Sequence, residues 1–283
     1  MGKLEGKIAL ITGGDNGIGL ATAKEFVNEG AYVFITGRRD AELAAATKEI
    51  ERNVTGVQGA VSNLGDLDRL FAHIKREKRK LDIVFASDDI GQFTPFGKRT
   101  GEYDQPTFDI RVKGLLFAVQ NAIPLLSDGA AIILNTSVVA GNEGSANSGD
   151  SGTRVAVRTF GRTWAMDLKD RRIRVNALNP GPIDMSHVND LLAATEASQQ
   201  GLLGRHGTDH AAAQTVVFLA SDDSWYITGQ ELLVDGSLLS NNVPLGRLGT
   251  AAEIAKAVVF LASDDSRHIT GMELFVGAGF AQL

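Results

Sequence analysis

The 283-residue chain contains no cysteine, which excludes a disulfide framework, a thiol nucleophile and a thiolate metal site. It also lacks a surplus of positive charge, because its formal net charge is −6 and its pI is about 5.4. A negative net charge does not attract nucleic acid or an anionic membrane. No apolar run reaches membrane-spanning length, and residues 1–6 lack an apolar signal region. We therefore expect a soluble, cytoplasmic protein that binds neither nucleic acid nor membrane.

Histidine is also scarce, with five residues in the chain. They lie at positions 73, 187, 206, 210 and 268, and no spacing among them is typical of a catalytic triad or a metal site. We expect surface positions for them and no metal centre.

Apolar runs typical of buried strands alternate with helical patterns up to about residue 180. The strand runs lie at residues 8–11, 32–36, 82–86, 131–136 and 174–178, and the helical patterns include 20–29, 108–126 and 150–170. Such alternation is what a parallel sheet with crossover helices requires. The expected fold class is α/β, a doubly wound parallel sheet of the Rossmann-like type in a single domain.

A glycine-rich segment joins the first strand to the first helix. It reads Thr12-Gly13-Gly14-Asp15-Asn16-Gly17-Ile18-Gly19. Glycines here permit a tight turn and let a pyrophosphate approach the backbone at the N-terminus of the helix. Since the segment follows a strand and opens a helix, it predicts a dinucleotide-binding loop.

Arg38 and Arg39 follow the second strand, and no acidic residue precedes Asp40 there. In such folds the end of this strand meets the adenosine ribose, where an acidic residue suits a free 2′-hydroxyl and arginines suit a 2′-phosphate. The pair favours NADP(H) over NAD(H) as cofactor. A solvated pair at the start of a helix remains the alternative.

These motifs, together with Ser137 after the strand at 131–136, resemble the short-chain dehydrogenase/reductase family over nearly the whole chain. The family's T-G-x-x-x-G-I-G loop matches residues 12–19, and its Pro-Gly turn beside the nicotinamide matches Pro180-Gly181. The resemblance implies a small-molecule substrate and a homo-oligomer, dimer or tetramer, paired through helices 108–126 and 150–170. The cofactor contacts it implies are Gly13, Asp15, Asn16, Gly17, Ile18, Gly19, Arg38, Arg39, Val61, Pro180 and Gly181.

Two departures from the family pattern weaken the expected cofactor binding. Asp15 places a carboxylate in the phosphate loop, and Ala60 stands where the family usually has an aspartate that contacts adenine.

The catalytic pattern departs further. In the family, a Tyr-x-x-x-Lys pair begins thirteen residues after the catalytic serine, and here those positions hold Asp150 and Arg154. The family's catalytic asparagine is replaced by Arg111, and its Asn-Ala-Gly segment reads Ser87-Asp88-Asp89. Ser137 alone is kept, so the candidate catalytic residues are Ser137, Asp150, Arg154 and Arg111.

These replacements change the acid–base chemistry. The ordinary pKa of Asp is about 3.9 and that of Tyr about 10, so at neutral pH Asp150 has no proton to give to a ketone. Arg154 stays charged and cannot shuttle a proton. The two stand four residues apart on one helix, acid before base, which is the favourable order for an ion pair. The family's carbonyl–alcohol oxidoreduction is therefore expected to be lost or altered.

Two alternatives remain open. In the first, the chain catalyses a different reaction with Ser137, Asp150, Arg111 and Arg154. In the second, it is a non-catalytic partner subunit of an active homologue. A divalent cation held by Asp88, Asp89 and Asp150 has no support from their spacing.

The C-terminal part of the chain repeats itself at a constant offset of 42 residues. Residues 203–232 recur as 245–274, including the strings Leu-Ala-Ser-Asp-Asp-Ser and Ile-Thr-Gly. Two copies are too few for a solenoid, so a duplicated last helix–strand unit is the simpler interpretation. We expect a dinucleotide-binding domain at 1–241 and an appended copy at 242–283, with the first copy supplying the last strand of the sheet.

Overall fold

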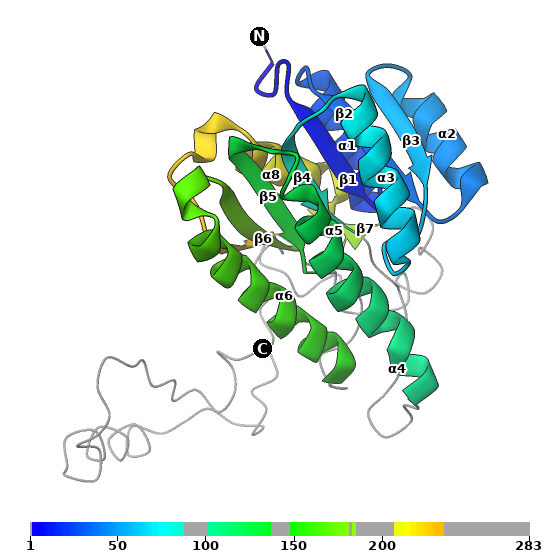
Figure 1. The fold of residues 1–283 in the computed structure, drawn as a ribbon, viewed down its shortest axis with the longest axis vertical. Coiled ribbons are helices and arrows are strands. Elements are labelled where there is room, and N and C mark those ends of the chain that lie inside the picture. Colours follow the sequence, from blue (N-terminus) through cyan, green and yellow to red (C-terminus); the bar gives the residue numbers. More distant parts are fainter. Residues whose placement is uncertain (1, 88–100, 137–147, 181–182, 185–206, 235–283) are drawn as a thin grey trace, which may run out of the picture.

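The computed structural model describes residues 2–87, 101–136, 148–180, 183–184 and 207–234 (Figure 1). These residues form a sheet of seven parallel strands in the order β3-β2-β1-β4-β5-β6-β9. The bounds are β1 Ile8–Thr12, β2 Tyr32–Gly37, β3 Val54–Gln58, β4 Leu81–Ala86, β5 Leu126–Asn135, β6 Arg174–Pro180 and β9 Glu231–Val234. The expected α/β fold with a doubly wound parallel sheet is confirmed.

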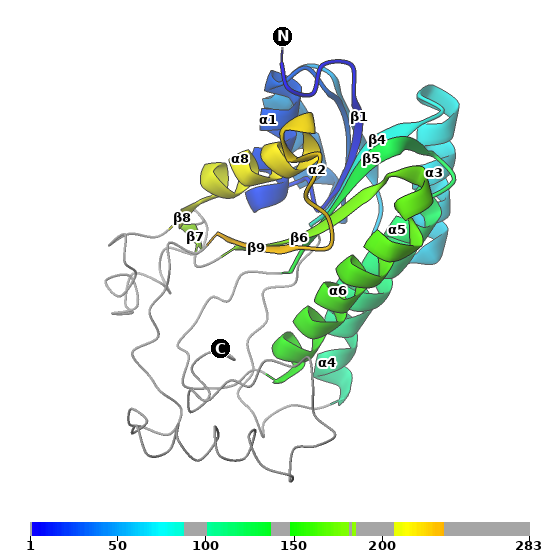
Figure 2. The same cartoon turned by 90° about the vertical axis from the view of Figure 1, so that its left-hand side faces the viewer.

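Helices cover both faces of this sheet, as Figure 2 shows. One face carries α1 Gly17–Asn28, α2 Asp40–Ile50 and α8 Asp209–Ala220, and the other carries α3 Leu64–Glu77, α5 Leu115–Ala122 and α6 Ser148–Asp167. Two short strands, β7 Ile183–Asp184 and β8 Gly207–Thr208, pair separately. Among the described residues, no helix combines the length and the apolar character that crossing a membrane requires.

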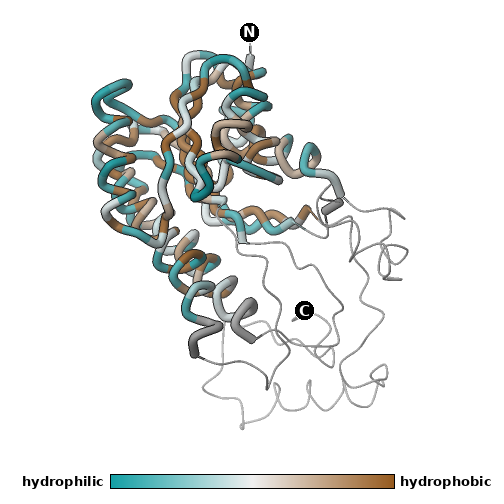
Figure 3. The backbone as a smooth tube through the Cα atoms, turned by 90° about the vertical axis from the view of Figure 1, so that its right-hand side faces the viewer, coloured by the Kyte–Doolittle hydropathy of each residue, from teal (hydrophilic) through white to brown (hydrophobic). Residues whose placement is uncertain are grey.

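The two layers of helices explain why the strands read as continuous apolar runs. Along β1, Ala9 and Ile11 join the core under α1 and α8, whereas Ile8 and Leu10 join the core under α3 and α5. Side chains alternate between the faces of a strand, so a sheet buried on both faces needs apolar residues at every position. Figure 3 shows the hydrophobic residues gathered along the strands and the hydrophilic ones on the outer turns of the helices.

The helix predicted at 108–126 has different bounds. Helical structure starts earlier, with α4 Gly101–Phe108, continues through the π-helical segment η1 Asp109–Gly114, and ends with α5 at Ala122. Pro124 has no amide hydrogen to continue the helical ladder. Leu126 already belongs to β5, where it pairs with Leu81 of β4. The prediction was therefore wrong at both ends of this helix.

The last strand of the sheet comes from the first of the two similar segments. Strand β9 pairs in parallel with β6, with Ala177 opposite Glu231 and Pro180 opposite Val234. This confirms the expectation that the first copy fills this place. The second copy lies outside the described residues, so the boundary between 1–241 and 242–283 stays a prediction.

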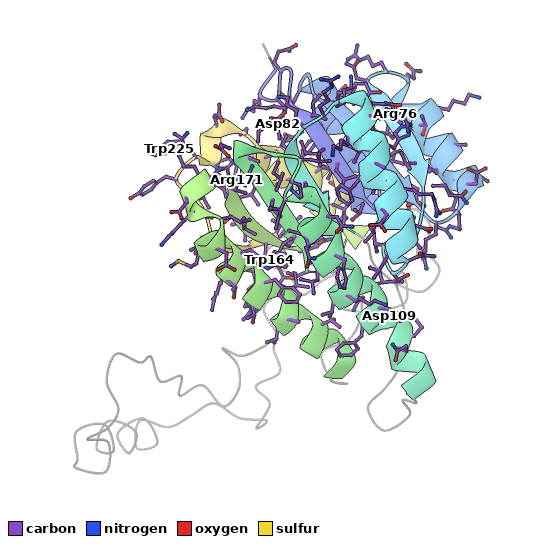
Figure 4. All side chains as sticks on the ribbon, viewed as in Figure 1. Arg76, Asp82, Asp109, Trp164, Arg171 and Trp225 are labelled. Atoms are coloured by element: carbon purple, nitrogen blue, oxygen red, sulfur yellow. The ribbon has the colours of Figure 1, made fainter. Side chains whose placement is uncertain are left out.

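The two helices through which subunits are expected to pair lie side by side. Helix α6 packs against α4 and η1. Helices α4 and α6 both extend past the end of the sheet in Figure 1. Trp164 of α6, labelled in Figure 4, stacks on Phe160 with 4.9 Å between the ring centroids. Val155 and Met166 of the same helix are exposed. The homo-oligomer itself stays a prediction.

Candidate functional site

The turn between β1 and α1 has the geometry that its glycines permit. Gly13 and Gly17 have φ angles of 62° and 49°, a region that residues with a side chain rarely adopt. A Cβ on Gly19 would overlap the carbonyl oxygen of Gly13, so the turn folds tightly onto the helix. The side chain of Asn16, which precedes the helix, makes no capping hydrogen bond. The N-terminus of α1 is thus presented toward the loop, an arrangement suited to an anion.

Hydrogen bonds hold this loop to the carboxyl ends of the neighbouring strands. The Gly14 amide donates to the Thr36 carbonyl at 3.1 Å, and the Thr36 hydroxyl donates to the Gly59 carbonyl at 3.3 Å. The Gly59 amide in turn donates to the Gly37 carbonyl at 3.1 Å. Hydrogen bonds therefore join the segments at the carboxyl ends of β1, β2 and β3 into one edge.

A pocket opens on this edge, and five of the eleven predicted cofactor residues line it. It is lined by Gly13, Asp15, Asn16, Gly37, Arg38, Arg39 and Ser87. Gly17, Ile18 and Gly19 form the first turn of α1, where the Ile18 side chain is buried in the core. Val61 is buried against Gly114 and does not line the pocket. Pro180 is the buried last residue of β6, and Gly181 lies outside the described residues.

Charges of both signs meet at the mouth of the pocket. Burial raises the pKa of the Asp15 carboxyl, and the nearby guanidinium groups of Arg39 and Arg38 only partly oppose this. Arg39 forms an ion pair with Glu42, one turn along α2. Arg38 and Arg39 are both exposed, so their guanidinium groups are accessible to an incoming anion.

The pocket lies where the order of the strands reverses. Strand β1 has β2 on one side and β4 on the other, so the chain leaves β1 and β4 toward opposite ends of the sheet. The Ser87 amide, which follows β4, donates to the Thr12 hydroxyl at 3.1 Å, and the Asn135 side-chain amide donates to the Ser87 hydroxyl at 3.4 Å. In open α/β sheets, ligands bind in the crevice at this reversal.

Sequence reasoning missed a carboxylate beside this edge. Asp66 accepts a hydrogen bond from the Ala60 amide at 2.8 Å, and it is also paired with Arg69. It thus places an acidic group beside the backbone of residue 60. The Asn63 side chain caps the N-terminus of α3, and Asp66 on the first turn of this helix reaches back to residue 60.

The candidate catalytic residues are only partly described. Ser137, Asp88 and Asp89 lie outside the described residues, and Asp150 and Arg154 are placed only as positions on α6. Arg111 is buried within η1, which packs against α6. A Cβ on Gly152 would lie 4.0 Å from the Phe108 ring, so the turn that carries positions 150–154 lies beside the turn preceding Arg111. The Asp150–Arg154 ion pair stays a prediction.

A dinucleotide-binding α/β fold is defined by three features together: the reversal of strand order at β1, the glycine turn after β1 and the N-terminus of α1. A family model described as enoyl-(acyl carrier protein) reductase matches residues 13–239 and, a second time, residues 237–281. The chain belongs to the short-chain dehydrogenase/reductase family of oxidoreductases.

The alignments with two relatives each cover 83% of this chain. The oxidoreductase asL5 of Sarocladium schorii is 41% identical over 241 residues, which cover 83% of this chain and 97% of the relative. An NADP-dependent (R)-specific alcohol dehydrogenase of Lentilactobacillus kefiri is 34% identical over 245 residues, with coverage of 83% and 97%. The structure of L-sorbose reductase from Gluconobacter frateurii, complexed with NADPH and L-sorbose, is similar with a TM-score of 0.77. It shares 25% identity, with coverage of 86% of this chain and 99% of that one.

Proposed function

We propose that the chain binds NADP(H) in the pocket lined by Gly13, Asp15, Arg38 and Arg39. The proposal rests on one observation. A tight glycine turn and the N-terminus of α1, which has no side-chain cap, lie beside two exposed arginines. The backbone amides of the first turn of α1 would hold the pyrophosphate. Arg38 and Arg39 would hold a 2′-phosphate, since a guanidinium group donates in a fork that matches phosphate oxygens. When bound, the nicotinamide would give or take a hydride.

Cofactor titration tests this proposal. We expect NADPH to bind more tightly than NADH, and the double variant Arg38→Ala/Arg39→Ala to lose about tenfold or more of the NADPH affinity with little change for NADH. Quenching of protein fluorescence on titration with each cofactor gives both dissociation constants. A variant at the exposed Arg52, Arg52→Ala, controls for the loss of positive charge. Equal affinities for the two cofactors, or no binding at millimolar concentrations, would contradict the proposal.

We also propose that carbonyl–alcohol oxidoreduction is lost or strongly reduced in this chain. The support is chemical, because Asp150 and Arg154 stand where the family has the tyrosine that exchanges the substrate proton and the lysine that lowers its pKa. An ionised carboxylate has no proton to give, and an arginine cannot exchange one near neutral pH. The chain would then bind the cofactor and a small molecule without efficient turnover.

Restoring the missing pair tests this second proposal. We expect Asp150→Tyr or Arg154→Lys alone to change NADPH oxidation little, whereas the double variant raises it above background. Positioned acid–base catalysis is typically worth about 10²- to 10⁴-fold, and residues that act as a unit are not additive. The assay follows NADPH oxidation with a panel of small ketones and quinones. Turnover by the unmodified chain that Asp150→Asn abolishes would contradict the proposal and favour the alternative of a reductase with altered chemistry.

A further inference from the structure

Asp15 occupies an unusual position at the cofactor pocket. A Cβ built on Gly37 would lie 2.5 Å from both Cγ and Oδ2 of Asp15. The carboxylate of the phosphate loop is therefore packed directly onto the end of β2, one residue before Arg38. It lies at the part of the pocket where the adenosine ribose is expected.

The same carboxylate lies in the field of both arginines. Its ionisation is opposed by burial and by Glu42, and favoured by a backbone hydrogen bond and by Arg39 and Arg38. Glu42 also forms an ion pair with Arg39. Two carboxylates thus compete with any bound anion for two guanidinium groups, and Asp40, the first residue of α2, adds a third negative charge nearby. The arginine pair is consequently a weaker phosphate site than the two side chains alone would provide.

The two forms of the cofactor respond oppositely to a carboxylate in this place. A 2′-phosphate carries most of two negative charges at neutral pH and is repelled by it. A 2′-hydroxyl can donate a hydrogen bond to it, and hydrogen bonds to ionised groups are among the stronger ones in proteins. One side chain therefore acts on the affinity for NADPH and on the affinity for NADH with opposite sign.

We propose that Asp15 is a specificity-determining residue, whose carboxylate limits the preference for NADPH set by Arg38 and Arg39 and keeps NADH usable as cofactor. This inference rests on the proposed function, since it requires that the loop after β1 binds a nicotinamide dinucleotide. It adds that selectivity is a balance between two arginines and one acid, and that the acid comes from the phosphate loop.

The test compares Asp15→Asn with the unmodified chain by fluorescence titration against NADPH and NADH. Asparagine keeps the shape of the side chain and removes its charge. The ratio of the NADH to the NADPH dissociation constant should rise by about tenfold or more, through tighter NADPH and weaker NADH binding. A second variant, Asp15→Ser, should shift the ratio in the same direction. Thermal melting of each variant checks that the fold is retained.

Asp40→Asn is the matched control. It removes the same unit of charge from an exposed residue that follows Arg39 directly. A change in net charge alone would shift the ratio equally in Asp15→Asn and Asp40→Asn, and that result would overturn the inference. So would an unchanged ratio in both Asp15 variants while NADPH still binds. If neither cofactor binds the unmodified chain or any variant, the proposed function itself fails and the inference falls with it.

Titration with adenosine 2′,5′-bisphosphate and with 5′-AMP gives a readout that does not involve the nicotinamide. These two probes differ only in the 2′-phosphate, so Asp15→Asn should strengthen binding of the bisphosphate relative to 5′-AMP. If the ratio for these fragments does not change, the inference is overturned even where the ratio for the intact cofactors shifts.

Discussion

Asp15 and Asp82 are both withdrawn from water, yet their pKa values move in opposite directions. Burial dominates at Asp15 and raises its pKa, because the arginines nearby compensate only in part. Burial acts on Asp82 in the same sense, but hydrogen bonds from Lys80, the Ile8 amide and Ser127 outweigh it, and the pKa is lowered. Ionisation of Asp15 therefore costs stability, whereas ionisation of Asp82 stabilises the fold.

Replacing Asp82 tests this at the scale of one residue. Because its pKa in the folded state lies below the unfolded value of about 3.8, Asp82 contributes stability above that pH and loses the contribution as the pH falls through the folded-state value. We expect Asp82→Asn to lower the free energy of unfolding at pH 7 by about 1–3 kcal/mol. The difference should vanish toward acid pH.

Urea unfolding at several pH values measures this difference. Asp170→Asn, at an exposed carboxylate, is the control and should stay within about 0.5 kcal/mol of the unmodified chain. A loss at Asp82→Asn that is the same at pH 7 and near pH 3 would contradict the assignment, because the effect would then come from packing and not from charge.

At the scale of the element, Arg174 joins the first C-terminal segment to the rest of the fold. Its buried guanidinium group donates to the Leu219 carbonyl and the Ser224 hydroxyl, both at 2.7 Å, and to the Ser221 carbonyl at 3.0 Å. Burial lowers its pKa, with Asp222 acting in the opposite direction. These bonds satisfy carbonyls at the C-terminus of α8, which a helix leaves without partners.

Neighbouring residues of β6 continue the attachment. The Val175 amide donates to the Thr228 hydroxyl at 3.0 Å, and the Asn176 side chain donates to the Ile227 carbonyl at 2.9 Å. The Gly229 amide donates to the Val175 carbonyl at 2.7 Å. The segment from α8 to β9 is therefore held to β6 by a continuous series of hydrogen bonds.

Elements defined by local pattern could be predicted, and elements defined by distant contacts could not. The glycine loop and the arginine pair are local, since each follows a strand whose apolar run is visible in the sequence. The start of α4 at Gly101 and the π-helical segment around Arg111 carry no such signal. Asp66 was missed for the same reason, because its bond to the Ala60 amide depends on how α3 folds back on the preceding loop. The contacts of Arg174 with the far end of α8 likewise appear only in three dimensions.

At the scale of the whole molecule, the second C-terminal segment carries the same attachment residues as the first. Ser221, Ser224, Thr228 and Glu231 of the first copy recur as Ser263, Ser266, Thr270 and Glu273. Glu231 accepts a hydrogen bond from the Asn179 side chain at 3.2 Å and pairs with Arg158 at 2.7 Å. The family model matches a second time at residues 237–281, and the duplication of this unit stays a prediction.

Two of the differences between the copies fall at strongly exposed aromatic residues. Trp225 and Tyr226 are 72% and 85% exposed, Trp225 lies at the surface in Figure 4, and the second copy has Arg267 and His268 in their places. Coverage agrees with an added unit, since the alignment to asL5 spans 97% of that relative but 83% of this chain. One sheet has room for one such strand beside β6, and the first copy fills it.

Deletion variants test whether the chain is complete without its second copy. Helix α8 buries Val216, Val217 and Leu219 against α1 and the sheet, and each such side chain contributes about 1.5–3 kcal/mol. Because the first copy supplies these contacts and strand β9, we expect a chain of residues 1–241 to remain folded, with a melting temperature within a few degrees of the full chain.

A chain of residues 1–202 should fail to fold cooperatively, since losing α8 and β9 removes about as much stability as a typical domain has. Circular dichroism during heating, with solubility on expression, distinguishes the three chains. If residues 1–241 are insoluble while deletion of 203–244 leaves a folded protein, the second copy is the one that completes the sheet in solution.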